Sequence, residues 1–314
     1  RIMEISILLA EQILAMFLTM AVGFGVVRAG LFKTEDSRII SNMVVYICNP
    51  CVVVHSFQIE LTDDKIKGLM IAIGLSVVVH MVLIIGSEIL SFIFHFNSIE
   101  KASIIYTNAG YLVIPLVGAV LGEEWVFYTT AFILVQTVLM WTHGVKLIGQ
   151  EKELNIRKIL CNPNVIAMII GIALFALEIR LPTVVDSCVS GFGDMISPAS
   201  MMVIGMVIGD VDLKWVFHQK RPYLICLLRL IVFPLIAVVA FAGLERSGIH
   251  PDAEYILMIV LIATSAPAAA MITQLAQIYG KDSRYASVIN VMSVIFCIIT
   301  MPVMVLSYEM LIAL

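Results

Sequence analysis

Ten apolar runs, each close to the length that crosses a bilayer, determine what this chain can fold into. A spanning helix needs about 20 mostly apolar residues. The runs cover 5–27, 38–58, 67–93, 101–121, 125–148, 163–179, 184–208, 221–243, 254–278 and 285–311. Charged residues make up only 13% of the chain, against about 25% in soluble domains. We therefore predict an all-α integral membrane protein with ten transmembrane helices and no soluble domain.

The first run is a retained span rather than a signal peptide. It is longer than a signal-peptide core and lacks a small-residue cleavage site after it. Residue 1 is Arg rather than Met, so we expect the natural protein to begin upstream. The net charge is −4 and no basic stripe is present, which argues against a nucleic-acid partner.

The loop charges orient the chain, because Lys and Arg accumulate on the inner side of a membrane. With the N-terminus outside, thirteen basic residues fall on the inner side and five on the outer side, and Arg229 lies within a span. We expect both termini outside the plasma (inner) membrane. The inner linker 149–161 separates a first five-helix repeat, 1–148, from a second, 162–314. Because five is odd, the second repeat is inverted.

Two of the spans are interrupted, and they correspond under this repeat. Thr107–Pro115 and Ala263–Ala270 place polar residues, Gly or Pro inside apolar runs, and Pro115 and Pro267 lie 152 positions apart. A helix that restarts in the membrane presents free N–H groups and a positive dipole end, which suits an anion. Further contacts are predicted from the side chains of Asn108, Thr264 and Ser265. The alternative is a pair of proline kinks, which membrane helices tolerate.

Ionisable residues inside spans are candidate functional groups. His80, Glu88 and Asp194 are candidates for proton coupling, His80 because imidazole titrates near neutral pH. A neutral His80 bonded inside the bundle is the alternative. Arg229 has two candidate roles, which are snorkelling to the inner face and pairing with an acid or anion.

Motifs of enzymes are weak or absent. Cys48-Asn49-Pro50-Cys51 has the spacing of a redox or metal pair, but packing of two small residues is the favoured interpretation. Gly191-Phe192-Gly193-Asp194 is typical of intramembrane aspartyl proteases, which need a second carboxylate; no other span contains an Asp. No zinc-protease or phosphate-loop motif is present. We expect no enzyme activity, no metal and no cofactor.

The ordered motifs resemble the auxin efflux carrier family, a membrane transporter family that includes bacterial malate and malonate permease-like proteins. The first half contributes Asn108-x-Gly110-x-x-x-x-Pro115, Gly122-Glu123-Glu124 and Val135-Gln136-x4-Trp141. The second contributes Asn162-Pro163, Arg229-Leu230-x-x-x-Pro234, Ala266-Pro267-Ala268-Ala269 and Tyr279-Gly280. The likeness covers essentially the whole chain.

The resemblance implies the fold of bile-acid symporters and sodium/proton antiporters, with discontinuous helices 4 and 9 crossing at their prolines. Helices 1, 2, 6 and 7 would form a scaffold that makes a homodimer. Helices 3–5 and 8–10 would form a transport domain that moves by an elevator-type mechanism. The implied substrate site holds residues of the crossing and residues of the scaffold: Asn108, Gly110, Pro115, Thr264, Ser265 and Pro267, with Asn49, Cys51, Ser197 and Ser200 facing them.

The expected function is therefore secondary transport of small organic anions, such as malate, other mono- or dicarboxylates, or auxin-like acids. Where bile-acid symporters carry Glu and Gln for sodium, this chain has Ala266, Pro267 and Ala268, which disfavours a sodium site of that kind. The rival hypothesis is a membrane sensor or receptor that keeps the fold without transport.

Overall fold

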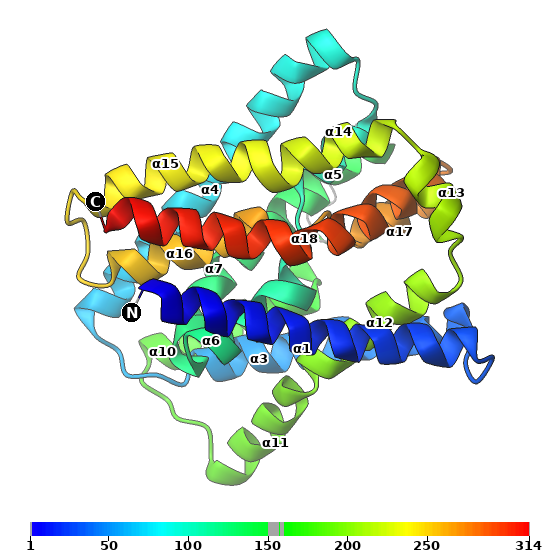
Figure 1. The fold of residues 1–314 in the computed structure, drawn as a ribbon. Helices are drawn as coiled ribbons and strands as arrows, with labels where there is room; N and C mark the ends of the chain where they lie inside the picture. The colour runs from blue at the N-terminus through cyan, green and yellow to red at the C-terminus, as the bar shows by residue number, and fades with distance from the viewer. Residues whose placement is uncertain (1, 150–156, 158–159, 314) are drawn as a thin grey trace.

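The computed structural model describes residues 2–149, 157 and 160–313, which are organised as helices joined by short loops (Figure 1). The predicted linker 149–161 lies almost entirely outside the described residues. The helices of the first half, with η for 3₁₀ and π segments, are α1 (Ile2–Arg28), η1 (Thr34–Asp36), α2 (Ser37–Met43), η2 (Val44–Cys48), α3 (Asn49–Ser56), α4 (Asp63–Phe94), α5 (Ser98–Ile105), η3 (Ala109–Val113), α6 (Ile114–Val120), α7 (Glu123–Leu139), η4 (Met140–Gly144) and α8 (Val145–Gly149).

The second half continues in the same way after the linker. Its helices are α10 (Pro163–Ala176), α11 (Thr183–Asp194), α12 (Ile196–Gly209), α13 (Leu213–His218), α14 (Arg221–Leu227), η5 (Leu228–Val232), α15 (Phe233–Glu245), α16 (Ala253–Ser265), α17 (Met271–Ile278) and α18 (Ser283–Ile312). Within the described ranges the prediction of an all-helical protein is confirmed.

Among the described residues, each predicted apolar run overlaps an apolar helical segment. Six of these segments are long and apolar enough to cross a membrane, and four are shorter. The long segments are Thr34–Ser56, Asp63–Phe94, Glu123–Gly149, Thr183–Gly209, Arg221–Glu245 and Ser283–Ile312; the shorter ones are Leu14–Arg28, Ala109–Val120, Pro163–Ala176 and Ala253–Ser265. The apolar composition thus located the helices correctly.

Polar residues at the helix starts explain several of the boundaries. Thr62 accepts a hydrogen bond from the Lys65 N–H at the start of α4, and Asn97 forms a reciprocal capping box with Glu100 at the start of α5. Asn162 caps α10 directly before Pro163. Such side chains satisfy N–H groups that have no partner within the helix, so a helix begins there.

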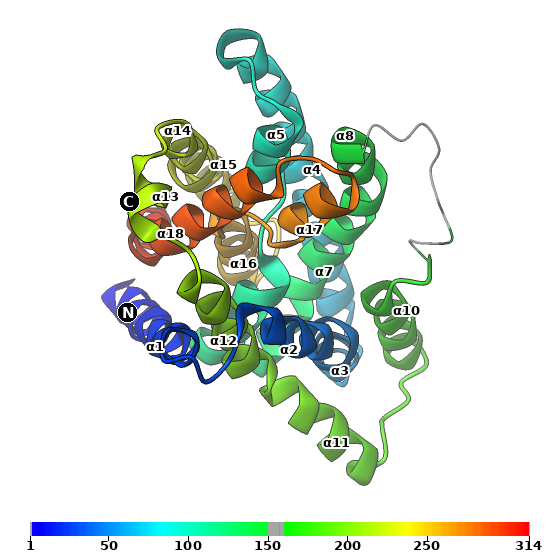
Figure 2. The same ribbon diagram turned by 90° about the vertical axis from the view of Figure 1, so that its right-hand side faces the viewer.

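The helices pack in two sets. In one, α1 lies along α12, and α3 packs against α10 and α11. In the other, α4, α7, α15 and α18 pack around α16, which lies in the middle of the molecule in Figure 2, and α5 packs against α4 and α18. Every residue of α16 from Ile256 to Ser265 is buried, as expected for a helix that is apolar on all sides. α1 contacts α18 and α6, and η3 contacts α12, so the two sets meet beside the interrupted helices.

Candidate functional site

The two interrupted helices cross at the points where they lose helical structure. α5 ends at Ile105 and α16 ends at Ser265, and the extended residues that follow pair as an isolated antiparallel bridge between Thr107 and Ala268. The Asn108 N–H donates to the Pro267 carbonyl at 2.8 Å, and the Ala269 N–H donates to the Tyr106 carbonyl at 3.0 Å. These bonds supply partners for N–H and carbonyl groups that lose their helical hydrogen bonds at the breaks. Lipid offers no such partners.

One of the two prolines lies away from this crossing. Pro267 accepts one of the bonds that hold it together. Pro115, by contrast, lies beyond the π segment η3, inside the helical segment 109–120 that restarts after the break. The expectation that the helices cross at both prolines is therefore wrong for Pro115. The first break is made by Tyr106–Asn108 instead.

Arg229 is the charged residue of the crossing. Its side chain is completely buried and comes from η5, a π segment that joins α14 to α15. It donates to the carbonyls of Ile104 (3.0 Å), Thr264 (2.7 Å) and Ala266 (3.1 Å). The guanidinium thus caps the C-terminal ends of α5 and α16 together. Complete burial contradicts the predicted snorkelling, and no ion pair joins Arg229 to a carboxylate in the described part of the chain.

Side chains from the neighbouring helices clamp each strand of the crossing. Gln136 on α7 accepts from the Thr107 N–H at 2.8 Å and hydroxyl at 2.9 Å, and it donates to the Thr107 carbonyl at 2.8 Å. On the other strand, the Ser293 hydroxyl accepts from the Ala268 N–H at 3.1 Å, and Asn290 donates to the Ala268 carbonyl at 2.7 Å. From the sequence, Gln136 is noted only as part of the Val135-Gln136-x4-Trp141 motif, and Asn290 and Ser293 are not identified, because their spacing from the breaks carries no signal.

Four of the predicted site residues each hold a buried polar atom without a hydrogen-bond partner. These atoms are the Nδ2 of Asn108, the Oδ1 of Asn49, and the hydroxyls of Ser200 and Ser265. Most buried polar side-chain atoms in proteins have a partner. Asn108 and Ser265 belong to the two segments that cross, the first after α5 and the second at the end of α16. Asn49 lies on α3, and Ser200 lies on α12, which packs against η3. These four atoms are therefore free to bond a ligand, although several other such atoms lie elsewhere among the described residues.

Gly110 allows one of these groups to approach the crossing. A Cβ at this position would lie 3.1 Å from the Asn49 Nδ2, so the missing side chain lets α3 reach η3. Thr264 contributes differently from the expectation. Its hydroxyl donates to the Val260 carbonyl at 2.6 Å, and its own carbonyl accepts from Arg229. The Thr264 hydroxyl therefore already donates its proton within α16 and does not offer it to a ligand in this structure.

The remaining scaffold-side candidates lie less close to the crossing. Cys51 lines a separate surface groove with Tyr46, Pro50 and Val54 of its own helix, facing α10 and α11. Ser197 is half-buried on α12, one turn before Ser200. The structure thus brings Asn49 and Ser200 toward the crossing and leaves Cys51 on another face of the same helix.

The candidates for proton coupling occupy three different settings. His80 is buried on α4, where its Nδ1 bonds the Ser76 carbonyl at 2.7 Å and its ring lies 4.8 Å from that of Phe132. Glu88 is half-exposed and pairs with Lys101 at 2.7 Å. Asp194 is exposed at the end of α11. His80 is the one with a buried ring atom, Nε2, that has no hydrogen-bond partner.

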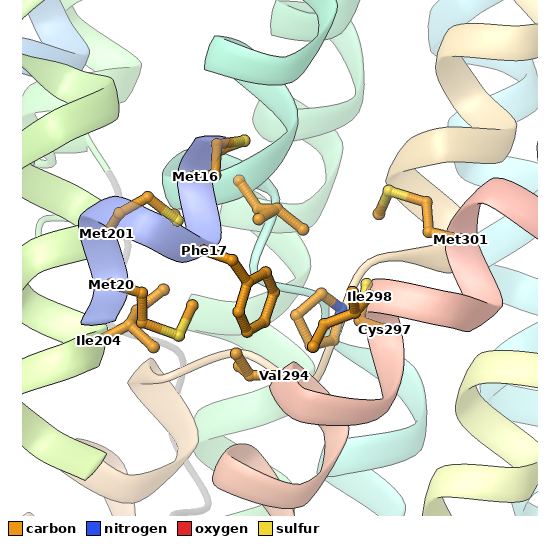
Figure 3. Close-up of a pocket in the computed structure, with 11 residues that line it drawn as sticks. Met16, Phe17, Met20, Met201, Ile204, Val294, Cys297, Ile298 and Met301 are labelled. Carbon is orange, nitrogen blue, oxygen red and sulfur yellow. The ribbon is translucent and has the colours of Figure 1, made fainter. Parts of the chain in front are cut away.

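An apolar pocket borders the crossing at Pro267 (Figure 3). Residues of α1, η3, α12 and α18 line it, including Met16, Phe17, Leu112 and Met201. Its volume is about 20 Å³, which is close to the space that one water molecule needs. The pocket lies between the two packing sets, since α1 and α12 line it on one side and α18 on the other.

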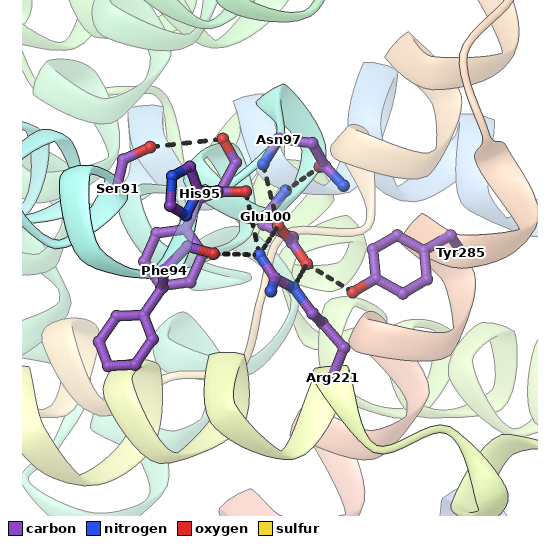
Figure 4. Close-up of polar contacts among 8 residues, drawn as sticks. Ser91, Phe94, His95, Asn97, Glu100, Arg221 and Tyr285 are labelled. Carbon is purple, nitrogen blue, oxygen red and sulfur yellow. Dashed lines mark hydrogen bonds and ion pairs between the residues drawn. The ribbon is translucent and has the colours of Figure 1, made fainter.

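A second polar cluster fixes the beginning of α5 (Figure 4). The carboxylate of Glu100, 1% exposed, accepts from Arg221 Nε at 2.7 Å and from the Tyr285 hydroxyl at 2.7 Å. Burial alone would raise the pKa of Glu100, but hydrogen bonds from Arg221, the Asn97 N–H and Tyr285 outweigh burial and lower the pKa. Arg221 also donates to the carbonyls at the end of α4. The cluster therefore joins α4, α5, α14 and α18 at one end of the bundle.

Comparison with known proteins agrees with a helical membrane protein. A family model described as membrane transport protein matches residues 8–156 and again residues 151–305, as two repeats. No individual curated protein matches the chain. Since the two matches together cover nearly the entire sequence, the chain belongs to this membrane transport protein family, which is the auxin efflux carrier family.

Proposed function

We propose that this membrane transporter carries small organic anions, and that the observation supporting this most directly is the position of Arg229. Two crossed, broken helices present two negative C-terminal ends and two positive N-terminal ends, each equivalent to about half an elementary charge. Arg229 bonds carbonyls at both C-terminal ends. Its unit charge offsets about −0.5 from each end, so the two positive ends remain in excess.

The excess charge favours a carboxylate beside the crossing. The positive ends belong to the helices that restart there, 109–120 and α17. Asn108 Nδ2 and the hydroxyls of Ser200 and Ser265 supply donors without a competing partner. An ionised carboxylate is an acceptor only, so a donor-rich site with surplus positive charge matches it. Asn49 and the Gly110 backbone complete the proposed site.

The adjoining pocket favours an anion with an apolar part. Met16, Phe17, Leu112 and Met201 offer carbon and sulfur surfaces, against which a second carboxylate would be desolvated without compensation. We therefore propose that a monocarboxylate with an apolar body, of the auxin-like kind, binds better than a dicarboxylate such as malate.

The proposed mechanism is alternating access of the elevator type. Helices 1, 2, 6 and 7 would act as the scaffold, and helices 3–5 and 8–10 as the transport domain that contains the crossing. Two observations support this division: the helices pack in the same two sets, and the pocket between the sets is too small for a substrate as it stands. A ten-span arrangement in the plasma membrane, with both termini outside, belongs to the same proposal.

We further propose that the scaffold binds a second copy of the chain. Ser187, Gly191 and Asp194 are exposed along α11, and a carboxylate in contact with lipid is unfavourable. Small residues also favour close helix contacts in membranes. Cys188 is exposed on the same helix, so oxidative crosslinking of the purified protein should give a dimer. Its replacement by serine should remove that product.

The experiment that tests the function is uptake into proteoliposomes, paired with ligand binding followed by thermal shift. Purified protein is screened with indole-3-acetate, lactate, malonate and malate, and a ligand should raise the melting temperature by mass action. Ser265→Ala and Ser200→Ala should lose much of the shift while their unliganded stability stays equal or rises, since each removes an unsatisfied buried hydroxyl. Ser247→Ala makes the same chemical change at an exposed turn after α15, away from the proposed site and the proposed dimer contact, and should bind normally.

Two results would contradict the proposal. If binding is unchanged in both serine variants and in Asn108→Ala, the site is not at the crossing. If an organic cation is transported and no carboxylate competes with it, the charge argument fails. Binding of a carboxylate without any flux would support the sensor hypothesis instead.

A further inference from the structure

The three carbonyls around Arg229 have the form of a cation site. Ile104 O belongs to the last turn of α5, whereas Thr264 O and Ala266 O belong to the end of α16. Carbonyls in a last helical turn have no partner within their helix and carry the negative end of its dipole. In transporters with broken helices, such carbonyl ends bind the coupling sodium ion. Here the partner of the carbonyls is a side chain.

The position of the guanidinium is fixed by the π segment η5 and by its three hydrogen bonds. Arg229 lies in η5, a π segment, and π segments are rare distortions that concentrate at functional sites. Its side chain is fully buried, with Nε, Nη1 and Nη2 each bonded to a different carbonyl at 2.7–3.1 Å. Arginine stays protonated in proteins, so the site holds a cation that cannot dissociate.

We propose that Arg229 is a built-in counterpart of a coupling cation. It assembles the crossing by joining α5 to α16, and it does so without sodium or any other dissolved ion. Wild-type stability is therefore independent of the monovalent cation present. We also expect transport to need no sodium gradient, and this expectation rests on the proposed function. The binding of the Arg229 guanidinium to the three carbonyls does not depend on that function.

The first test empties the site. Arg229→Ala is purified and its melting temperature is measured in choline, potassium or sodium chloride at equal ionic strength, each with and without a millimolar series of methylguanidinium. The expected result is a lowered melting temperature that methylguanidinium or sodium restores in a saturable way, while the wild type does not respond. Arg246→Ala is the control, because Arg246 also donates to a helix-end carbonyl, Leu311 O, but at the exposed surface.

Two milder substitutions test the same site if Arg229→Ala does not fold. Arg229→Lys retains the charge, and Arg229→Gln retains hydrogen-bond donors without charge. The lysine variant should be the more stable in choline, and sodium should narrow the difference. Equal stability of the two variants, or rescue of Arg229→Ala no greater than that of Arg246→Ala, would overturn the proposal. These measurements need no substrate, so they stand whether or not the anion assignment is correct.

Discussion

Substituting alanine for Gly205 should separate the two most closely packed helices of the protein. At Gly205, a Cβ would lie 1.9 Å from the Met20 carbonyl oxygen of α1, and at Gly23 a Cβ would lie 2.3 Å from the Met202 carbonyl oxygen of α12. Each helix thus fits its glycine against the backbone of the other. Small residues permit such contact between membrane helices, and backbone atoms have no rotamer by which to yield.

The size of the effect follows from these distances. Real Cβ atoms essentially never approach other atoms more closely than 3.0 Å, so the contact at 1.9 Å requires a movement of about 1 Å. Overpacking of this kind typically costs about 1–3 kcal/mol. Alanine returns up to about 1 kcal/mol through its helix propensity. The net expectation is a loss of about 1–2 kcal/mol, which corresponds to a fall of a few degrees in melting temperature.

The assay is thermal unfolding of the purified protein in detergent, with a matched control on the same pair of helices. A Cβ at Gly25 of α1 would meet nothing within 4 Å, so Gly25→Ala changes composition identically without a clash. It should melt at or slightly above the wild-type temperature. If Gly205→Ala and Gly25→Ala melt together, the close approach of α1 and α12 is refuted.

Three further predictions concern the crossing, the polar cluster around Glu100 and the predicted orientation in the membrane. Gln136→Leu removes three bonds to Thr107 and should lower the free energy of unfolding by roughly 2–4 kcal/mol, as unsatisfied buried groups cost; equal thermal stability would contradict the clamp. Folding lowers the pKa of Glu100. The ionised carboxylate therefore stabilises the folded protein above the pKa that Glu100 has in the unfolded chain, and this stabilisation is lost as the pH falls through the lower pKa of the folded protein. Glu100→Gln should therefore melt lower at neutral pH, by about 1–3 kcal/mol, with a smaller acid dependence than the wild type. Cys161 is exposed beside the predicted inner linker, so an impermeant maleimide should label it in inverted vesicles and not in intact cells.

The helices were predictable from sequence because their signal is strong and local. Within the described residues each apolar run overlaps an apolar helical segment, and caps such as Asn97 and Asn162 stand where helices begin. The interruption of the fourth and ninth spans was also predictable, since Gly, Asn and Pro in an apolar run have few other uses. Local composition therefore identified which helices are special.

The position of the first break was not predictable in the same way. The repeat was aligned on Pro115 and Pro267, but the chain breaks at Thr107, where no residue forbids a helix. The break exists because Gln136, Pro267 and Ala269 supply partners for the backbone there. Those partners come from other helices, and their arrangement depends on tertiary contacts that a single span does not record.

The same reasoning explains why Arg229 was misjudged, and why it matters for the anion preference. An arginine two turns inside a span can snorkel, and its sequence neighbours Leu228 and Leu230 do not distinguish that from burial. Arg229 is buried because α5 and α16 end beside it, each with backbone carbonyls that accept its hydrogen bonds. From sequence, the crossing lacked a fixed cation and was electrically balanced. With Arg229 bonded to the carbonyls at the negative ends, the two positive ends are left in excess, so the anion preference that we propose would rest on a fixed charge as well as on helix dipoles.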